Sequence, residues 1–172
     1  MTERLMAAMI RYDSGDAKRI QHFLKVHALA RLIGTEEGLD SDEMVILETA
    51  ALVHDIGIRL CEKKYGRCSG GLQEKEGPAE ARRLLEELGY PPAVIERVVY
   101  LVGHHHTYRH IDGRDYQILV EADFLVNLYE DAVSPEGIRR AYDAVFRTES
   151  GRRLCREMFM AEVNCQTKSN RS

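Results

Sequence analysis

Apolar residues recur at intervals of three and four along most of this chain, the spacing of helices that bury one face. Glycine, proline and short polar runs interrupt the pattern and divide it into eight predicted helices. These helices begin near residues 2, 17, 41, 76, 91, 115 and 135, and Ser150-Gly151 separates the seventh from the eighth. No alternating strand pattern stands out, so the sequence predicts an all-α fold.

The third predicted helix, with Ser41 as its N-cap, is apolar on nearly all sides from Met44 to Ile56, so we expect it to be buried. His54 and Asp55 stand side by side near its end, just before Gly57. Burying a histidine beside an aspartate is costly unless something binds both. A divalent cation offsets that cost, because imidazole and carboxylate are both common metal ligands.

The second predicted helix carries two histidines, and they differ in their relation to its apolar stripe. His22 lies within the angular spread of Phe23 and Val26, whereas His27 lies about 100° away at the edge of the stripe. A ligand that meets Asp55 must face the core. We therefore predict His22 as the ligand and His27 as a surface or packing histidine.

Asp123 lies inside the apolar run of residues 119–126, on the sixth predicted helix. A lone carboxylate in such a run should be paired or should coordinate a metal. Asn127 is one turn further on the same face, where it could orient the carboxylate. The alternative is that Asp123 serves as a cap or takes part in a salt bridge.

Three consecutive histidines, His104, His105 and His106, follow the fifth predicted helix. Helical rotation spreads three consecutive residues over about 200°, so at most two of them can reach one site. A polar helix end is the alternative explanation for the run.

Residues 58–73 contain three glycines and several charges, which predicts a long loop. The basic residues of this loop could contact phosphate, or they could simply form a solvated face. They are Arg59, Lys63, Lys64 and Arg67.

Composition narrows the classes of protein. The chain has 172 residues, 44% hydrophobic and 30% charged, with a formal net charge of −4, which suits one soluble globular domain and disfavours nucleic acid as a partner. The four cysteines form no C-x-x-C pair, so we expect reduced thiols. No apolar leader and no stretch of membrane-spanning length occurs, so we expect a cytoplasmic protein with no membrane partner.

These residues resemble a known family. His22, then His54-Asp55, then Asp123 are similar to the H…HD…D signature of the HD-domain metal-dependent phosphohydrolases. The segments Leu52–Gly57 and Glu121–Leu125 look like its central and last motifs. The resemblance covers roughly residues 16–131, and the helices over 134–163 match none of its motifs.

The resemblance implies a helical bundle that forms one domain over residues 1–172, with a divalent ion held by His22, His54, Asp55 and Asp123. The ion could be Mg, Mn, Fe, Co or Ni. Family members with two metals carry further ligands, and the candidates for these in this chain are Glu76, His105 and His106. Glu76 departs from the family pattern, which has a histidine, so a second ion remains an open alternative.

The implied function is hydrolysis of a phosphate ester or anhydride in a nucleotide or similar small metabolite. Asp55 and His105 would be catalytic, and Arg59 and Lys63 would contact phosphate. Two other classes stay open, a di-iron oxygenase of the same fold and a non-catalytic nucleotide-binding module. A homodimer is a further expectation, because Met6, Met9, Phe159 and Met160 suggest an apolar surface for a second copy.

Overall fold

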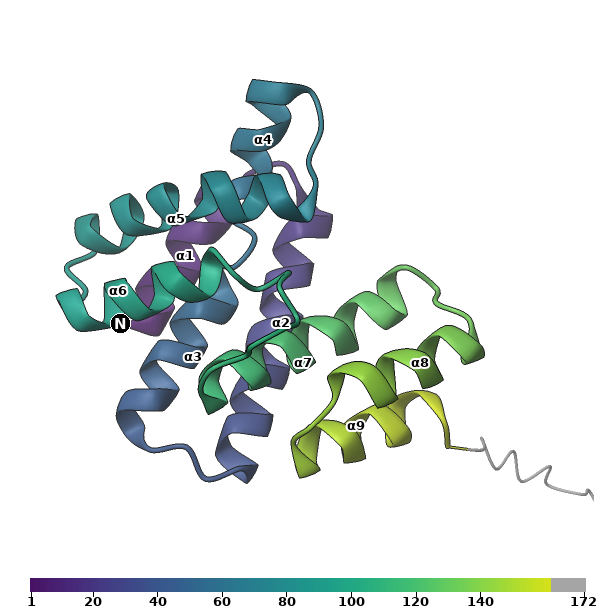
Figure 1. The fold of residues 1–172 in the computed structure, drawn as a ribbon. Helices are drawn as coiled ribbons and strands as arrows, with labels where there is room; N and C mark the ends of the chain where they lie inside the picture. The colour runs from purple at the N-terminus through teal and green to yellow at the C-terminus, as the bar shows by residue number, and fades with distance from the viewer. Residues whose placement is uncertain (162–172) are drawn as a thin grey trace, which may run out of the picture.

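The computed structural model describes residues 1–161, and that part of the chain folds into nine helices without a strand, which confirms the all-α prediction (Figure 1). In chain order the helices are α1 (Thr2–Tyr12), α2 (Ala17–Glu36), α3 (Ser41–Val53), α4 (Gly57–Tyr65), α5 (Gly70–Glu87), α6 (Pro92–Val102), α7 (Arg114–Glu130), α8 (Pro135–Val145) and α9 (Glu149–Phe159). No helix in this range is long and apolar enough to cross a membrane.

Helix α3 lies at the centre of the bundle and packs against α1, α2, α6 and α7. Its side chains from Ala50 to Val53 are fully buried, as its apolar composition predicts. The helix begins one residue earlier than expected, because Asp40 rather than Ser41 is the N-cap. Asp40 accepts hydrogen bonds from the backbone of Glu43, and the Glu43 side chain returns to the Asp40 backbone, forming a capping box.

The predicted loop over residues 58–73 is wrong, because most of it is helical. Helix α4 occupies its first half and α5 begins at Gly70, so Pro78 lies inside α5 rather than near its start. Glycines on either side of the predicted loop permit close packing. A Cβ atom on Gly57 would lie 2.9 Å from the backbone nitrogen of Gly77, so α4 and α5 meet at two glycines.

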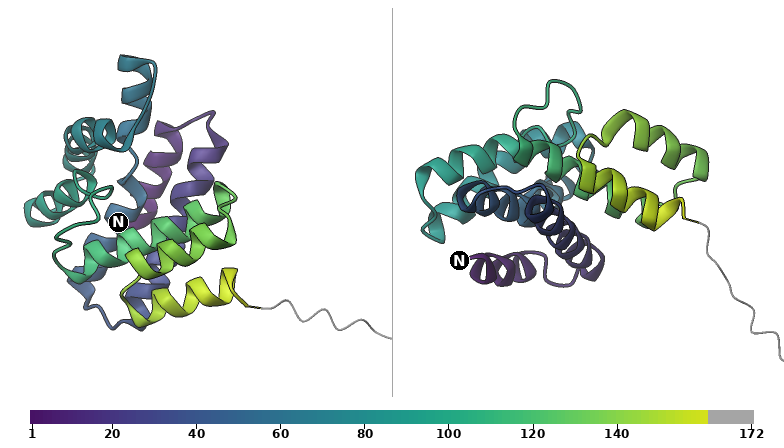
Figure 2. Two further views of the ribbon diagram at one scale, coloured as in Figure 1. Left: turned by 45° about the vertical axis from the view of Figure 1, so that its right-hand side comes forward. Right: turned by 90° about the horizontal axis from the view of Figure 1, so that it is seen from below.

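The C-terminal helices also differ from the prediction. Ser150 and Gly151 do not separate two helices but lie within the first turn of α9, whose N-cap is Thr148. Helices α8 and α9 pack against each other and against α7, on the side of the molecule away from α5 and α6 (Figure 2).

Of the apolar side chains expected at a dimer surface, one belongs to the core and three pack against it. Met9 is 1% exposed, and Met6, Phe159 and Met160 are partly buried against the core. A homodimer stays a prediction.

Candidate metal centre

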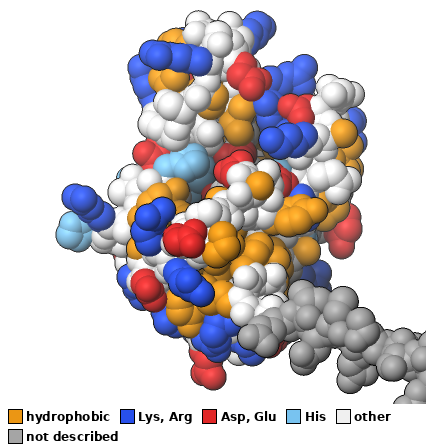
Figure 3. Space-filling view, turned by 90° about the vertical axis from the view of Figure 1, so that its right-hand side faces the viewer, with side chains coloured by type: hydrophobic (Ala, Val, Ile, Leu, Met, Phe, Trp, Pro, Cys, Tyr) orange, Lys and Arg blue, Asp and Glu red, His pale blue; other side chains and the backbone are white. Residues whose placement is uncertain are grey.

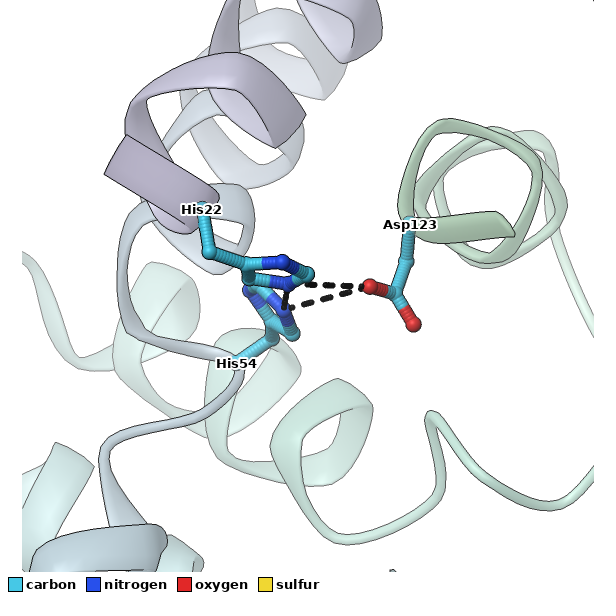
Figure 4. Close-up of side chains that lie close together, drawn as sticks. All are labelled: His22, His54 and Asp123. Atoms are coloured by element: carbon cyan, nitrogen blue, oxygen red, sulfur yellow. Dashed lines mark hydrogen bonds and ion pairs between the residues drawn. The ribbon is translucent and has the colours of Figure 1, made fainter. Parts of the chain in front are cut away.

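Side chains from three parts of the fold converge on one point. His22 comes from the second turn of α2, His54 and Asp55 follow the last residue of α3, and Asp123 lies in the middle of α7. Figure 4 shows the His22 and His54 rings facing the Asp123 carboxylate from the opposite side of a narrow gap. His105, in the turn after α6, reaches the same region from a fourth segment.

The distances within this cluster are short. His22 Nε2 lies 3.3 Å from His54 Nε2 and 3.2 Å from Asp123 Oδ1. His54 Nε2 lies 3.6 Å from Asp123 Oδ1 and 3.6 Å from Asp55 Oδ2, and His22 Nε2 is also 3.6 Å from Asp55 Oδ2. The structure therefore brings together all four residues that the sequence singled out as ligands of one ion.

The partners of the Nδ1 atoms of His22 and His54 determine whether the Nε2 atoms of the neutral rings carry a proton or a lone pair. His54 Nδ1 lies 2.9 Å from the Ala51 carbonyl, and His22 Nδ1 lies 3.1 Å from Glu130 Oε2. Both partners accept hydrogen bonds, so Nδ1 of each neutral ring donates and Nε2 offers a lone pair. Two lone pairs and two carboxylates facing one another at these distances repel unless a cation lies between them. This donor set fits a divalent ion.

A second group shares Asp55 with the first. One ligand atom each of Asp55, His105 and His106 lies within 4.8 Å of the others. His105 Nδ1 donates to the Val102 carbonyl at 2.9 Å, and its buried Nε2 has no hydrogen-bond partner among the described residues, although it lies 3.5 Å from Asp55 Oδ1. His106 Nε2 lies 3.0 Å from Gln73 Oε1.

The structure leaves His104 outside both groups. Its Nδ1 lies 2.7 Å from the Tyr100 carbonyl and its ring stacks on the Tyr100 ring. Of the three consecutive histidines, His105 and His106 are the two that face Asp55.

Glu76, the predicted second-metal candidate, does not join either group. Its carboxylate accepts from Lys64 Nζ at 3.0 Å and from the Tyr65 hydroxyl at 2.6 Å. The face of α5 that carries Glu76 therefore turns toward α4. Its neighbour Gly77 is the residue that packs inward, against Gly57 and Val102.

Arg59 and Lys63, the predicted phosphate contacts, do not line the cavity at the metal centre, although Arg59 borders an adjacent hollow that also includes Arg19 and Glu62. They line a separate cavity with Tyr12 and Glu80, and the Arg59 guanidinium donates to the Tyr12 carbonyl. The prediction placed them on a loop from which they could contact phosphate. Because the segment forms helix α4, the helical backbone fixes the directions in which Arg59 and Lys63 point.

Electrostatics within the cluster favour a bound positive charge. Burial lowers the pKa of His54, but the charge of Asp55 and the Asp123 carboxylate outweigh it and raise the pKa to about 9. Burial raises the pKa of Asp55, yet His54 and His105 bring it down to about 2. The pKa of Asp123 is also lowered, against its burial, by His22 and His54. Both carboxylates therefore stay ionised at neutral pH.

A cavity of about 410 Å³ opens onto this cluster and includes His22 and Asp55 in its wall. Lys18 and Arg19 also line it, and sequence reasoning missed both. Their spacing was the available signal. Residues four and three positions before His22 share its face of the helix.

Glu130 is a further residue that the sequence analysis missed. Its carboxylate accepts from Lys25 Nζ at 2.6 Å and lies 3.1 Å from His22 Nδ1. Burial raises the pKa of Glu130, but the bonds from Lys25 and His22 outweigh it and lower the pKa. Asn127 similarly donates to Asp123 Oδ1 at 2.9 Å, the orienting contact that its position one turn after Asp123 suggested.

We expect Glu130→Leu to weaken binding of Mn²⁺ by about 10–100-fold, because His22 loses the acceptor that fixes its ring. Glu130→Gln should lose much less, since the amide oxygen can still accept from Nδ1. Competition titration against a fluorescent chelator measures both. A leucine variant that binds Mn²⁺ as tightly as the parent protein would show that packing alone holds the His22 ring.

Comparison with known proteins agrees with this geometry. Residues 19–140 match the HD domain family, so the chain belongs to that family. A solved structure with the same fold is the crystal structure of a predicted HD superfamily hydrolase from an uncultured Thermotogales bacterium. It has a TM-score of 0.66 at 23% sequence identity, covering 92% of this chain and 84% of the other. Comparison with curated proteins finds no match.

Proposed function

We propose that this protein is a metal-dependent hydrolase that cleaves a phosphate ester or anhydride of a small metabolite. Membership of the HD domain family supports a metal-dependent hydrolase in general. The observation that carries the proposal is the convergence of His22, His54 and two ionised carboxylates beside a cavity large enough for a small molecule. A divalent ion, when bound, lowers the pKa of water and polarises a phosphoryl oxygen.

The residues of the chain would have separate roles in binding the ion and in proton transfer. His22, His54, Asp55 and Asp123 would hold the ion. Asp55 extends toward both groups, because its Oδ2 faces His22 and His54 while its Oδ1 faces His105.

His105 is the candidate for proton transfer. Its Nε2 is buried and lacks a hydrogen-bond partner among the described residues, so it is free to hold a proton for the leaving oxygen. Val102 fixes the ring by accepting from Nδ1.

The number of ions separates this proposal from oxygenase chemistry, which needs a complete second set of ligands. The group formed by Asp55, His105 and His106 supports a second ion. The engagement of Glu76 by Lys64 and Tyr65 argues against Glu76 as a member of that set. We therefore favour hydrolysis, with one ion held by His22, His54, Asp55 and Asp123.

The test is elemental analysis after anaerobic purification, followed by phosphate release from a panel of phosphorylated metabolites with Mg²⁺, Mn²⁺, Co²⁺ or Ni²⁺. We expect about one ion per chain and metal-dependent release of phosphate. Two irons per chain with consumption of O₂ would instead indicate an oxygenase. Tight nucleotide binding with no turnover under any metal would indicate a regulatory module.

A further inference from the structure

The cavity beside the candidate metal centre is lined mainly by charged side chains, and carboxylates outnumber cations. Five carboxylates line it, against the cations of Lys18 and Arg19. The carboxylates belong to Asp16, Asp55, Glu62, Glu130 and Asp131. Figure 3 shows acidic side chains and a histidine meeting in the hollow on this side of the molecule.

Arg19 is already paired with carboxylates of the protein and is not free to bind phosphate. Its guanidinium contacts both oxygens of Glu62, at 3.0 and 3.1 Å, and lies 3.2 Å from Asp16 and 3.5 Å from Asp13. Its side chain is 13% exposed, so three carboxylates surround a single, largely covered cation. A second phosphate arriving at this end of the cavity would meet a surplus of negative charge.

The remaining charged side chains do not change the negative sign of the net charge of the cavity. Glu130 is engaged by Lys25 and His22, deep in the wall. At the rim, no ion pair within residues 1–161 engages the Asp131 carboxylate or the Lys18 ammonium. The rim therefore offers one free acceptor of strong hydrogen bonds and one exposed lysine, and neither forms a cage for a polyphosphate.

The lining also lacks a surface on which a base could stack. Ile58 is its one apolar side chain, and no Phe, Tyr or Trp ring of the described residues contributes to it. The remaining groups are hydrogen-bonding atoms, mostly acceptors, which suit hydroxyl and ammonium donors.

We propose that the substrate is a phosphomonoester whose organic part carries hydroxyl or ammonium groups rather than further phosphates. This inference rests on the proposed phosphohydrolase function and narrows it from esters and anhydrides to esters. In the reaction, the oxygen of water bonds to phosphorus as the P–O bond to the alcohol breaks. The leaving alkoxide takes a proton, so that an alcohol and inorganic phosphate are formed and nothing is oxidised or reduced.

The test uses matched compounds with the Mn²⁺-loaded full chain at constant free Mn²⁺. AMP and ADP differ by one phosphate, while phosphoethanolamine and 2-hydroxyethyl phosphate differ from ethyl phosphate by an ammonium or by a hydroxyl. We expect kcat/KM for AMP to exceed that for ADP by about tenfold, and the same advantage of phosphoethanolamine or 2-hydroxyethyl phosphate over ethyl phosphate. The thermal shift that each compound produces should follow the same order.

Variants that change the charge of the cavity test whether its carboxylates cause the preference for AMP over ADP. Asp131→Asn combined with Glu62→Gln should reduce the AMP-to-ADP ratio by about threefold or more, because it removes two negative charges from the cavity. Lys18→Ala, which removes the exposed cation, should leave ADP disfavoured.

The outcomes separate the two proposals. If ADP is turned over or bound better than AMP, or if ethyl phosphate does as well as both of its polar counterparts, the inference on substrate class is wrong. If no compound releases phosphate, hydrolysis itself fails. The order of thermal shifts then still decides whether the cavity prefers monoesters.

Discussion

Asp55→Ala should abolish phosphate release, with kcat falling by about 10³-fold or more, because it removes an electrostatic group that no neighbour replaces. Asp55 belongs to the ligand group with His105 and His106, and its Oδ2 also lies 3.6 Å from the Nε2 atoms of His22 and His54. Its loss leaves His22, His54 and Asp123 as the buried remainder, which should bind a divalent ion far more weakly. The stabilisation that a saturating ion gives, about 2.7 kcal/mol at a hundredfold excess over Kd, should disappear with it. Phosphate release, metal content and the thermal shift with Mn²⁺ measure these three effects.

His27→Ala is the matched control on α2. His27 is as buried as His22, at 7% exposure, but its Nε2 lies 2.9 Å from Glu48 Oε2 and outside the cluster. The variant should therefore keep its metal and its activity, whereas His22→Ala should lose both. Full activity in Asp55→Ala would contradict the proposed site. Loss of metal in His27→Ala would contradict the choice between the two histidines.

The central part of this arrangement was predictable because it lies on strongly periodic helices. A polar pair directly after an apolar helix stands out in the sequence, and so does a carboxylate such as Asp123 within an apolar run. The apolar stripe of α2 likewise distinguished His22 from His27, since both become buried and only their directions differ. Periodicity determines the face on which a side chain lies, which is the information that a metal cluster requires.

The errors fall where local composition conflicts with tertiary packing. Glycines in residues 58–73 suggested a loop, but Gly57 and Gly77 on either side of that segment allow α4 and α5 to approach closely, and packing then stabilises both helices. The prediction therefore placed Arg59 and Lys63 on a loop, whereas the structure places them on helix α4. Glu130 was missed for another reason. Its contact with His22 joins α7 to α2 across 108 positions, and no local pattern encodes such a distant contact.

Glu121→Ala should cause a large loss of stability, about 3–5 kcal/mol. Glu121 is fully buried in α7, two residues before Asp123 and on another face of the helix. Its Oε1 accepts from the backbone nitrogens of Arg147 at 2.6 Å and Thr148 at 2.9 Å, and from Gln117 at 2.7 Å. Its Oε2 accepts from the Thr148 hydroxyl. Removing the carboxylate leaves these buried donors without an acceptor and releases the linker between α8 and α9.

Gly151 supports this interpretation, because a Cβ atom at that position would collide with Glu121 Oε2. The chain therefore approaches the carboxylate as closely as a backbone without a side chain allows. Glu121→Gln keeps one acceptor oxygen and most of the volume, so we expect a smaller loss of about 1–2 kcal/mol. Glu157→Ala, which removes only the exposed i,i+4 partner of Arg153, should change stability by less than about 0.5 kcal/mol.

Urea unfolding of these variants separates the role of Glu121 from that of the metal centre. Because Glu121 lies on a different face of α7 from Asp123, the folded Glu121→Ala protein should still bind Mn²⁺ at temperatures below its transition. The transition midpoint should fall while the affinity for Mn²⁺ changes little. If the midpoint instead stays within the range of the Glu157→Ala control, the carboxylate does not hold α8 and α9 against α7. If affinity falls in step with stability, the C-terminal helices help to position Asp123.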